Sequence, residues 1–339
     1  MAKKSSPTGN SAQKKTIQGK SRRASPAKKR KANPKPVVEP KVISAKNALK
    51  GLVIRSGAVR EIGRGTLLAC DPRKEARGIP HVIALKWQNE TFTRVDAKFD
   101  ARSACFIEGP ERLLLTASSQ GTYSLAGHTG GNIFRDIEAK SARKRYGDIR
   151  SLGVVAGTGY AVGYQGSVYR FDRIEKKWTI FDEGLPSNFD IEAIDGFGEN
   201  EIYVVGFKGQ VWQFDGSKWF YWPTPTEVNL NAIKCGGNGI VYLGGSRGEL
   251  LAGRKESWVR IEHEITRENI WDLEWFEGAL YVSTMLGVFR LDANGLKEVD
   301  FGADEPSTTY HLSEASGVLW SIGSDDVMSF DGRFWTRIV

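Results

Sequence analysis

The sequence contains few of the residues that brace small secreted domains or hold metal ions. Its three cysteines, Cys70, Cys105 and Cys235, are widely spaced, and its four histidines are isolated from one another. An odd number of cysteines without CxxC spacing forms neither a disulfide framework nor a zinc site. The sequence therefore favours a reducing compartment and predicts no metal and no cofactor.

Long hydrophobic runs are also missing. No apolar stretch approaches the ~18 residues of a transmembrane helix, and the N-terminus lacks the apolar core of a secretory signal. We therefore expect no membrane partner, and we expect a cytoplasmic protein, or a nuclear one if the source is a eukaryote.

Acidic residues are nearly absent from the N-terminal segment. Residues 1–50 hold 15 Lys and Arg and a single acid, Glu39, for a net charge of +14, whereas the remainder of the chain carries −6. The overall charge of +8 therefore describes one segment and not a folded surface.

This segment has the composition of a disordered tail. Residues 1–36 contain 12 Lys and Arg, no acid and no aromatic residue, so they cannot bury enough apolar surface to offset their ordering entropy. We expect a disordered tail over 1–41 and a folded domain over 42–339. The charge density fits an anionic polymer, above all nucleic acid, although a solubilising tail would have the same composition. The tail resembles the Lys/Ala/Ser/Pro-rich tails of linker histones and bacterial nucleoid-associated proteins. Its candidate binding residues are Lys14, Lys15, Lys20, Arg22, Arg23, Lys28, Lys29, Arg30, Lys31 and Lys35.

Glycine and tryptophan are abundant, at 38 and 10 residues, and they recur periodically. A tight turn recurs about every 39–45 residues, at Gly78, Gly121, Gly166, Gly209, Gly248, Gly287 and Asp326. A large apolar residue follows each turn, at Phe92, Phe134, Trp178, Trp219, Trp258, Leu296 and Trp335. Seven copies at this period predict seven four-stranded sheets.

Two further signals complete each copy. An Asp or Asn before two spaced aliphatic residues, as in Asp190-Ile191 with Ile194, predicts a turn that enters the innermost strand. We expect its side chain to bond the backbone just ahead. An apolar run after a glycine-rich break, such as 202–206, predicts a strand buried on both faces.

Together these signals predict an all-β, seven-bladed β-propeller. The blade core resembles the WD40/YVTN-like propeller superfamily of bacteria, although the Trp-Asp dipeptide of true WD40 repeats is missing. The resemblance covers residues ~60–339 and implies an interaction module. Residues 42–58 fit either the first inner strand or an extra strand or short helix outside the ring. The core that carries the resemblance reads Gly209-Gln210-Val211-Trp212-Gln213-Phe214-Asp215-Gly216-Ser217-Lys218-Trp219.

Catalytic motifs are weak. Residues 244–248 match the G-x-S-x-G nucleophile pattern, but they fall in the repeated hairpin and not in the strand–turn–helix context that this chemistry needs. The inner strands could bring His311, Asp272 and Glu192 together near the central channel. A propeller hydrolase or lyase therefore stays an alternative, and no catalytic residue is assigned.

The favoured function is a non-enzymatic, monomeric propeller scaffold that binds a protein partner, with the tail as an electrostatic anchor. One alternative is an immunity-type protein that caps a toxin or another protein, and a second is a nucleic-acid-associated protein. We expect the partner-binding face to carry the turns and the loops 182–190, 223–229, 262–269 and 302–311. Its candidate residues are Gln120, Gln165, Lys208, Arg247 and Asp325.

If the tail binds nucleic acid, binding should be independent of base sequence and steep in salt. Engaging half of its charges, ~6 phosphates, predicts a log–log slope of about −5 on duplex DNA. Deleting residues 1–40 should abolish binding in a fluorescence anisotropy titration, because the remaining chain is acidic. Binding that survives this deletion would contradict the assignment.

Overall fold

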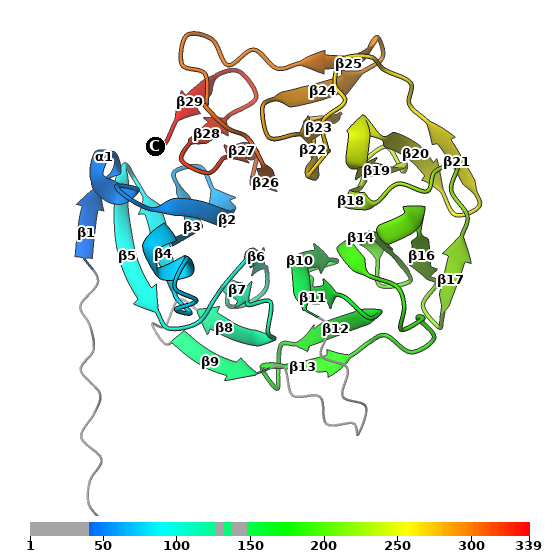
Figure 1. Cartoon of the computed structure of the whole chain (residues 1–339), viewed down its shortest axis with the longest axis horizontal. Helices are drawn as coiled ribbons and strands as arrows, with labels where there is room; N and C mark the ends of the chain where they lie inside the picture. Colours follow the sequence, from blue (N-terminus) through cyan, green and yellow to red (C-terminus); the bar gives the residue numbers. More distant parts are fainter. Residues whose placement is uncertain (1–40, 127–131, 137–147) are drawn as a thin grey trace, which may run out of the picture. The chain divides into compact units, whose positions relative to one another are not determined.

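The computed structural model describes residues 41–126, 132–136 and 148–339, and the basic segment 1–36 lies outside them. The strands in the described residues form seven antiparallel sheets, or blades, around a central channel (Figure 1). The predicted all-β, seven-bladed propeller is therefore confirmed. Neither of the two short α-helices in these ranges is long and apolar enough to cross a membrane.

The first three blades contain all of the α-helical residues in the described ranges. Their elements are β1 (Lys41–Ser44), α1 (Ala45–Ala48), β2 (Val53–Glu61), β3 (Arg64–Cys70), α2 (Pro72–Glu75), β4 (Val82–Gln88) and β5 (Thr91–Ala97) in blade 1; β6 (Ser103–Ile107), β7 (Leu113–Ala117), β8 (Thr122–Ala126) and β9 (Asn132–Asp136) in blade 2; and β10 (Ile149–Val155), β11 (Thr158–Gly163), β12 (Ser167–Asp172) and β13 (Lys177–Ile180) in blade 3.

The last four blades are regular four-stranded sheets. Their elements are β14 (Ile191–Gly198), β15 (Glu201–Gly206), η1 (Phe207–Gly209), β16 (Val211–Phe214) and β17 (Trp219–Trp222) in blade 4; β18 (Leu230–Cys235), β19 (Val241–Gly245), η2 (Ser246–Gly248), β20 (Leu250–Arg254) and β21 (Ser257–Arg260) in blade 5; β22 (Asp272–Phe276), β23 (Ala279–Ser283), β24 (Val288–Asp292) and β25 (Gly295–Glu298) in blade 6; and β26 (His311–Ala315), β27 (Val318–Ile322), β28 (Val327–Phe330) and β29 (Trp335–Arg337) in blade 7.

The predicted register of the repeat is correct. Each of the seven turn signals lies between the second and third strand of a blade, and each large apolar residue lies in the outermost strand of its regular four-stranded unit. Trp178, Trp219 and Trp258 are 4%, 7% and 9% exposed. Trp335 is only half-buried, because it closes the last blade against Phe301 and Phe330.

Residues 42–58 satisfy both of the alternatives left open by the sequence. β2 is the inner strand of blade 1, and β1 adds a fifth strand outside β5, with α1 between them. Ala48 of α1 is buried in the core that blade 1 shares with blade 7.

The ring closes without exchanging a strand, because every described blade consists of consecutive strands. Side-chain packing takes the place of a shared strand at the seam between blades 1 and 7. Trp320 lies so close to Gly65 that an added Cβ would stand 2.2 Å from its ring. The backbone N–H of Ile54 donates to the carbonyl of Ser324 at 2.7 Å across the same seam.

Equivalent outer-strand tryptophans should give equivalent losses of stability. We expect Trp219→Ala and Trp258→Ala each to lower the free energy of unfolding by ~3–5 kcal/mol, since both rings are buried. Half-buried Trp335→Ala should cost less, and exposed Lys208→Ala should stay within ~0.5 kcal/mol. Urea unfolding checks the series, and a harmless Trp219→Ala would contradict it.

Candidate functional site

One face of the ring collects the turns between second and third strands together with the loops that join successive blades. We call it the loop face. The two kinds of segment are tied together by side chains at the start of each inner strand. Oδ1 of Asp190, Asn229 and Asn269 accepts from the backbone N–H of Gln165, Lys208 and Arg247, at 3.2, 3.2 and 3.0 Å.

This finding corrects the expected role of the recurring Asp and Asn. Their side chains bond the turn of the preceding blade, and not the backbone just ahead of them. The turns also press closely on the loops. A Cβ at Gly166 or Gly209 would lie 2.4 or 2.1 Å from a loop carbonyl, and both glycines have positive φ. The loop face is therefore a braced surface and not a set of independent loops.

The predicted partner-binding residues all lie on this face. The turns present Gln120, Gln165, Lys208, Arg247 and Asp325, and all five are exposed. The sequence reasoning overlooked the turn of blade 6, where Met285 and Leu286 stand in place of a polar tip, and Leu286 is 72% exposed. An apolar residue in a repeated polar position was the signal that could have found it.

The loop face is strongly acidic over blades 3 to 7. The connecting loops 181–190, 223–229, 261–271 and 299–310 hold ten Asp and Glu residues and a single Lys or Arg, which is Arg267. Glu262, Glu264 and Glu305 are exposed, and none makes an ion pair with a residue that the structure describes. This excess of negative charge favours a positively charged partner.

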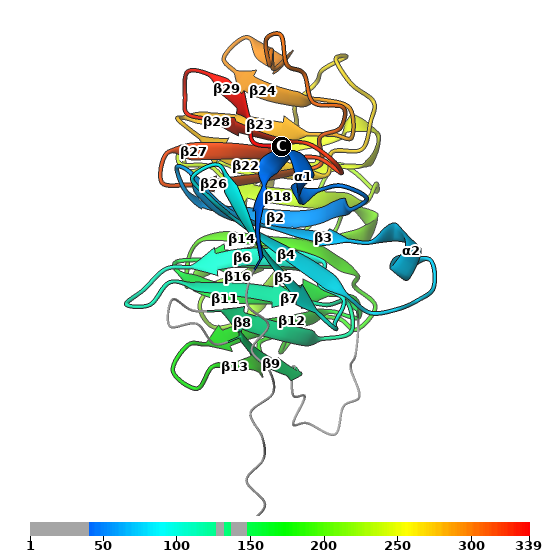
Figure 2. The ribbon, with the colours of Figure 1, turned by 90° about the vertical axis from the view of Figure 1, so that its left-hand side faces the viewer.

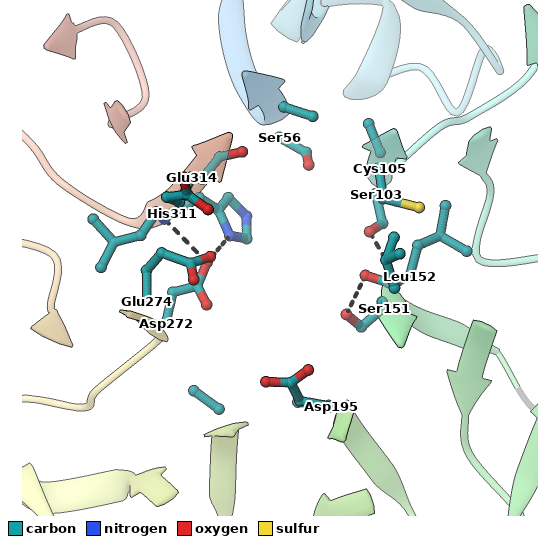
Figure 3. A pocket seen from close by; sticks show the side chains of 18 of the residues that line it. Ser56, Ser103, Cys105, Ser151, Leu152, Asp195, Asp272, Glu274, His311 and Glu314 are labelled. Carbon is teal, nitrogen blue, oxygen red and sulfur yellow. Dashed lines mark hydrogen bonds and ion pairs between the residues drawn. The ribbon is translucent and has the colours of Figure 1, made fainter. Parts of the chain in front are cut away.

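The inner strands enclose a polar channel with a cavity of about 770 Å³ (Figure 3). Its side chains satisfy backbone groups of the neighbouring blade. Ser103 Oγ accepts from Leu152 N–H at 3.0 Å, Asp195 Oδ2 from Cys235 N–H at 2.8 Å, and Asp272 Oδ2 from Leu312 N–H at 3.0 Å. Ser313 Oγ accepts from Val59 N–H at 3.0 Å and so joins the last blade to the first.

A second set of channel contacts is ionic. Lys234 of blade 5 pairs with Glu274 of blade 6, and Arg150 of blade 3 pairs with Glu192 of blade 4 at 3.0 Å. Burial raises the pKa of Glu274 to about 7, although Lys234 opposes the shift. Burial alone would lower the pKa of Lys234, but the carboxylates of Glu274 and Asp195 raise it above its usual range.

The channel brings His311 and Asp272 together, as the enzyme alternative required, with Nδ1 and Oδ2 3.4 Å apart, while Glu192 pairs with Arg150. Asp272 is already engaged in the blade-to-blade bond described above. Ser246 of the G-x-S-x-G match lies in η2, within the turn of blade 5. In the described residues no group of His, Cys, Asp and Glu is arranged to hold a metal ion.

Solved structures with the same architecture confirm the fold. Virginiamycin B lyase from Staphylococcus aureus matches with a TM-score of 0.64 at 7% identity, over 85% of this chain and 97% of that one. The RRP9 WD40 repeats match with a TM-score of 0.58 at 12% identity, over 84% and 93%. At these identities the likeness extends to the propeller fold alone. The fold and its braced loop face define a propeller of the protein-interaction class.

The sequence comparison places the chain more closely. Immune protein Tsi7 of Pseudomonas aeruginosa is 45% identical over 297 residues, which are 84% of this chain and 96% of that protein. The chain belongs to the Tsi7 family of immune proteins. No family model matches it.

The raised pKa of Glu274 predicts a specific pH dependence of stability. The folded protein keeps a proton that the unfolded chain releases near pH 4.5, so the contribution is present below pH 4.5 and is lost as the pH rises through about 7. Glu274→Gln should remove this decline from urea unfolding curves measured between pH 4.5 and 7.5. Exposed Glu256→Gln is the control, and parallel curves for wild type and Glu274→Gln would contradict the assignment.

Proposed function

We propose that this protein is an immunity protein that protects the cell producing it by binding and capping a protein toxin. The observation that carries the proposal is the 45% identity with immune protein Tsi7 over nearly the whole of that protein. Capping needs a surface and no catalytic group, which agrees with a channel whose polar side chains are occupied in joining blades.

The loop face is the surface that we assign to the toxin. Binding to a surface that is already braced costs less ordering entropy than binding to free loops. The turn residues Gln165, Lys208 and Arg247 are exposed, while their backbone amides are fixed by the next blade. The face can therefore display polar contacts in one arrangement.

The basic segment 1–36 is a separate proposal. Its 12 Lys and Arg without an acid favour capture of nucleic acid in a cytoplasmic protein whose folded domain follows the tail. Capping of a toxin by the loop face does not require this segment.

Protection in living cells tests the proposed function. Expression of a toxin gene that neighbours the gene for this chain should arrest growth of a host, and coexpression of the full-length chain should restore it. Purified chain and toxin should form a complex on size-exclusion chromatography. Continued arrest together with no complex for each neighbouring product would refute the proposal.

A matched pair of double variants locates the surface. Glu262→Lys with Glu264→Lys reverses two exposed acids of the loop face, and Glu90→Lys with Glu256→Lys reverses two exposed acids in hairpins of the opposite face. Both doubles change the net charge equally. We expect the first to weaken binding roughly tenfold and the second by less than about twofold, because only close charges contribute to the complex.

A further inference from the structure

Blade 6 departs from the other blades at its exposed turn. Blades 3, 4 and 5 place Gln165, Lys208 and Arg247 at the tip, each with a φ near +60°, whereas blade 6 places Leu286 there without positive φ. A leucine that is 72% exposed in a repeated polar position gains nothing from the fold itself.

The turn holds Leu286 in a fixed position. Thr284 Oγ1 accepts from the backbone N–H of Leu286 at 3.3 Å and of Gly287 at 3.2 Å. Thr309 of the following loop donates from its N–H to Met285 O at 3.0 Å and from its Oγ1 to Thr284 O at 2.9 Å. The apolar side chain is therefore displayed by a rigid turn.

Leu286 stands at the edge of a groove of about 300 Å³ formed with the loop after β25. Its apolar lining includes Val299, Phe301 and Pro306. Phe301 is fixed by its contact with Trp335 of blade 7, where the ring centroids lie 4.6 Å apart. The groove therefore has a firm apolar floor.

Carboxylates surround this floor without a counterion. Glu298, Asp300 and Glu305 line the groove, all three are exposed, and no lining residue is Lys or Arg. The nearby Arg337 is occupied elsewhere, by Asp304, Asp326 and the backbone carbonyl of Glu305. An apolar floor with an acidic rim is complementary to a Lys or Arg side chain, whose methylene stem covers apolar surface while its charge reaches the rim.

We propose that the blade 6 groove receives a basic segment of the partner protein, with Leu286 packing against an apolar residue of that segment. The proposal rests on the proposed function for the identity of the partner as a toxin. The chemistry of the occupant follows from the groove alone.

Photo-crosslinking in the full-length chain tests the occupant. Benzoylphenylalanine is placed at position 286 and, as a control, at position 62, because Ile62 is 70% exposed in a hairpin of the opposite face. In cells that make both proteins, position 286 should crosslink to a peptide of another protein that contains Lys or Arg, and position 62 should not. Crosslinks only to residues 1–36 of this chain, to a second copy, to an acidic peptide or to nothing would overturn the proposal.

Affinity measurements with the captured protein complete the test. Leu286→Gln should weaken binding at least tenfold, whereas Ile62→Gln should change it less than about twofold. Glu298→Lys with Glu305→Lys should weaken it roughly tenfold at low salt, with a smaller effect at high salt, compared with Glu90→Lys and Glu256→Lys. Wild-type affinity in Leu286→Gln would overturn the proposal.

The two proposals fail separately. If a basic segment of a non-toxic protein occupies the groove, the groove assignment stands and the immunity function fails. If a toxin is neutralised but Leu286→Gln binds it normally, the immunity function stands and the groove assignment fails.

Discussion

The propeller depends on how each inner strand satisfies the edge that faces the channel. A sheet pairs this strand on one side only, so its other backbone groups need partners from elsewhere. Ser103, Asp195, Asp272 and Ser313 provide them, and each accepts from the N–H of the blade that follows it around the ring. The bonds all run in the same direction, and the last one joins blade 7 to blade 1.

The same constraint explains why a polar channel does not imply catalysis. The residues that an enzyme would use are those that hold adjacent sheets together, as Asp272 does for Leu312. Binding is instead left to the turns and loops at the rim, where the Asp and Asn residues that begin the inner strands fix the turn of the blade before. Family membership with Tsi7 and an acidic, braced face lead to the same class of function.

The fold was predictable because its signals are local and repeated. Trp178, Trp219 and Trp258 recur at one position of the repeat, so the sequence could place them in the outer strand before the structure did. The contacts of the site were not predictable in this way. Lys234 and Glu274 lie forty residues apart, and their pairing depends on the rotation between two sheets, which no local pattern encodes. Leu286 is visible in the sequence, but its meaning depends on exposure and on a groove made by another loop.

Closure without a shared strand has a consequence for biosynthesis. Each sheet uses consecutive residues, so six blades can pair while the seventh is still being made, since domains fold from the N-terminus during synthesis. Trp320 and Ser313 then join the newest sheet to the oldest. A product that stops before blade 7 would keep six complete sheets and an open seam, exposing Gly65 and its apolar neighbours to quality control. The final residues of the chain therefore act as a checkpoint that separates finished rings from unfinished ones.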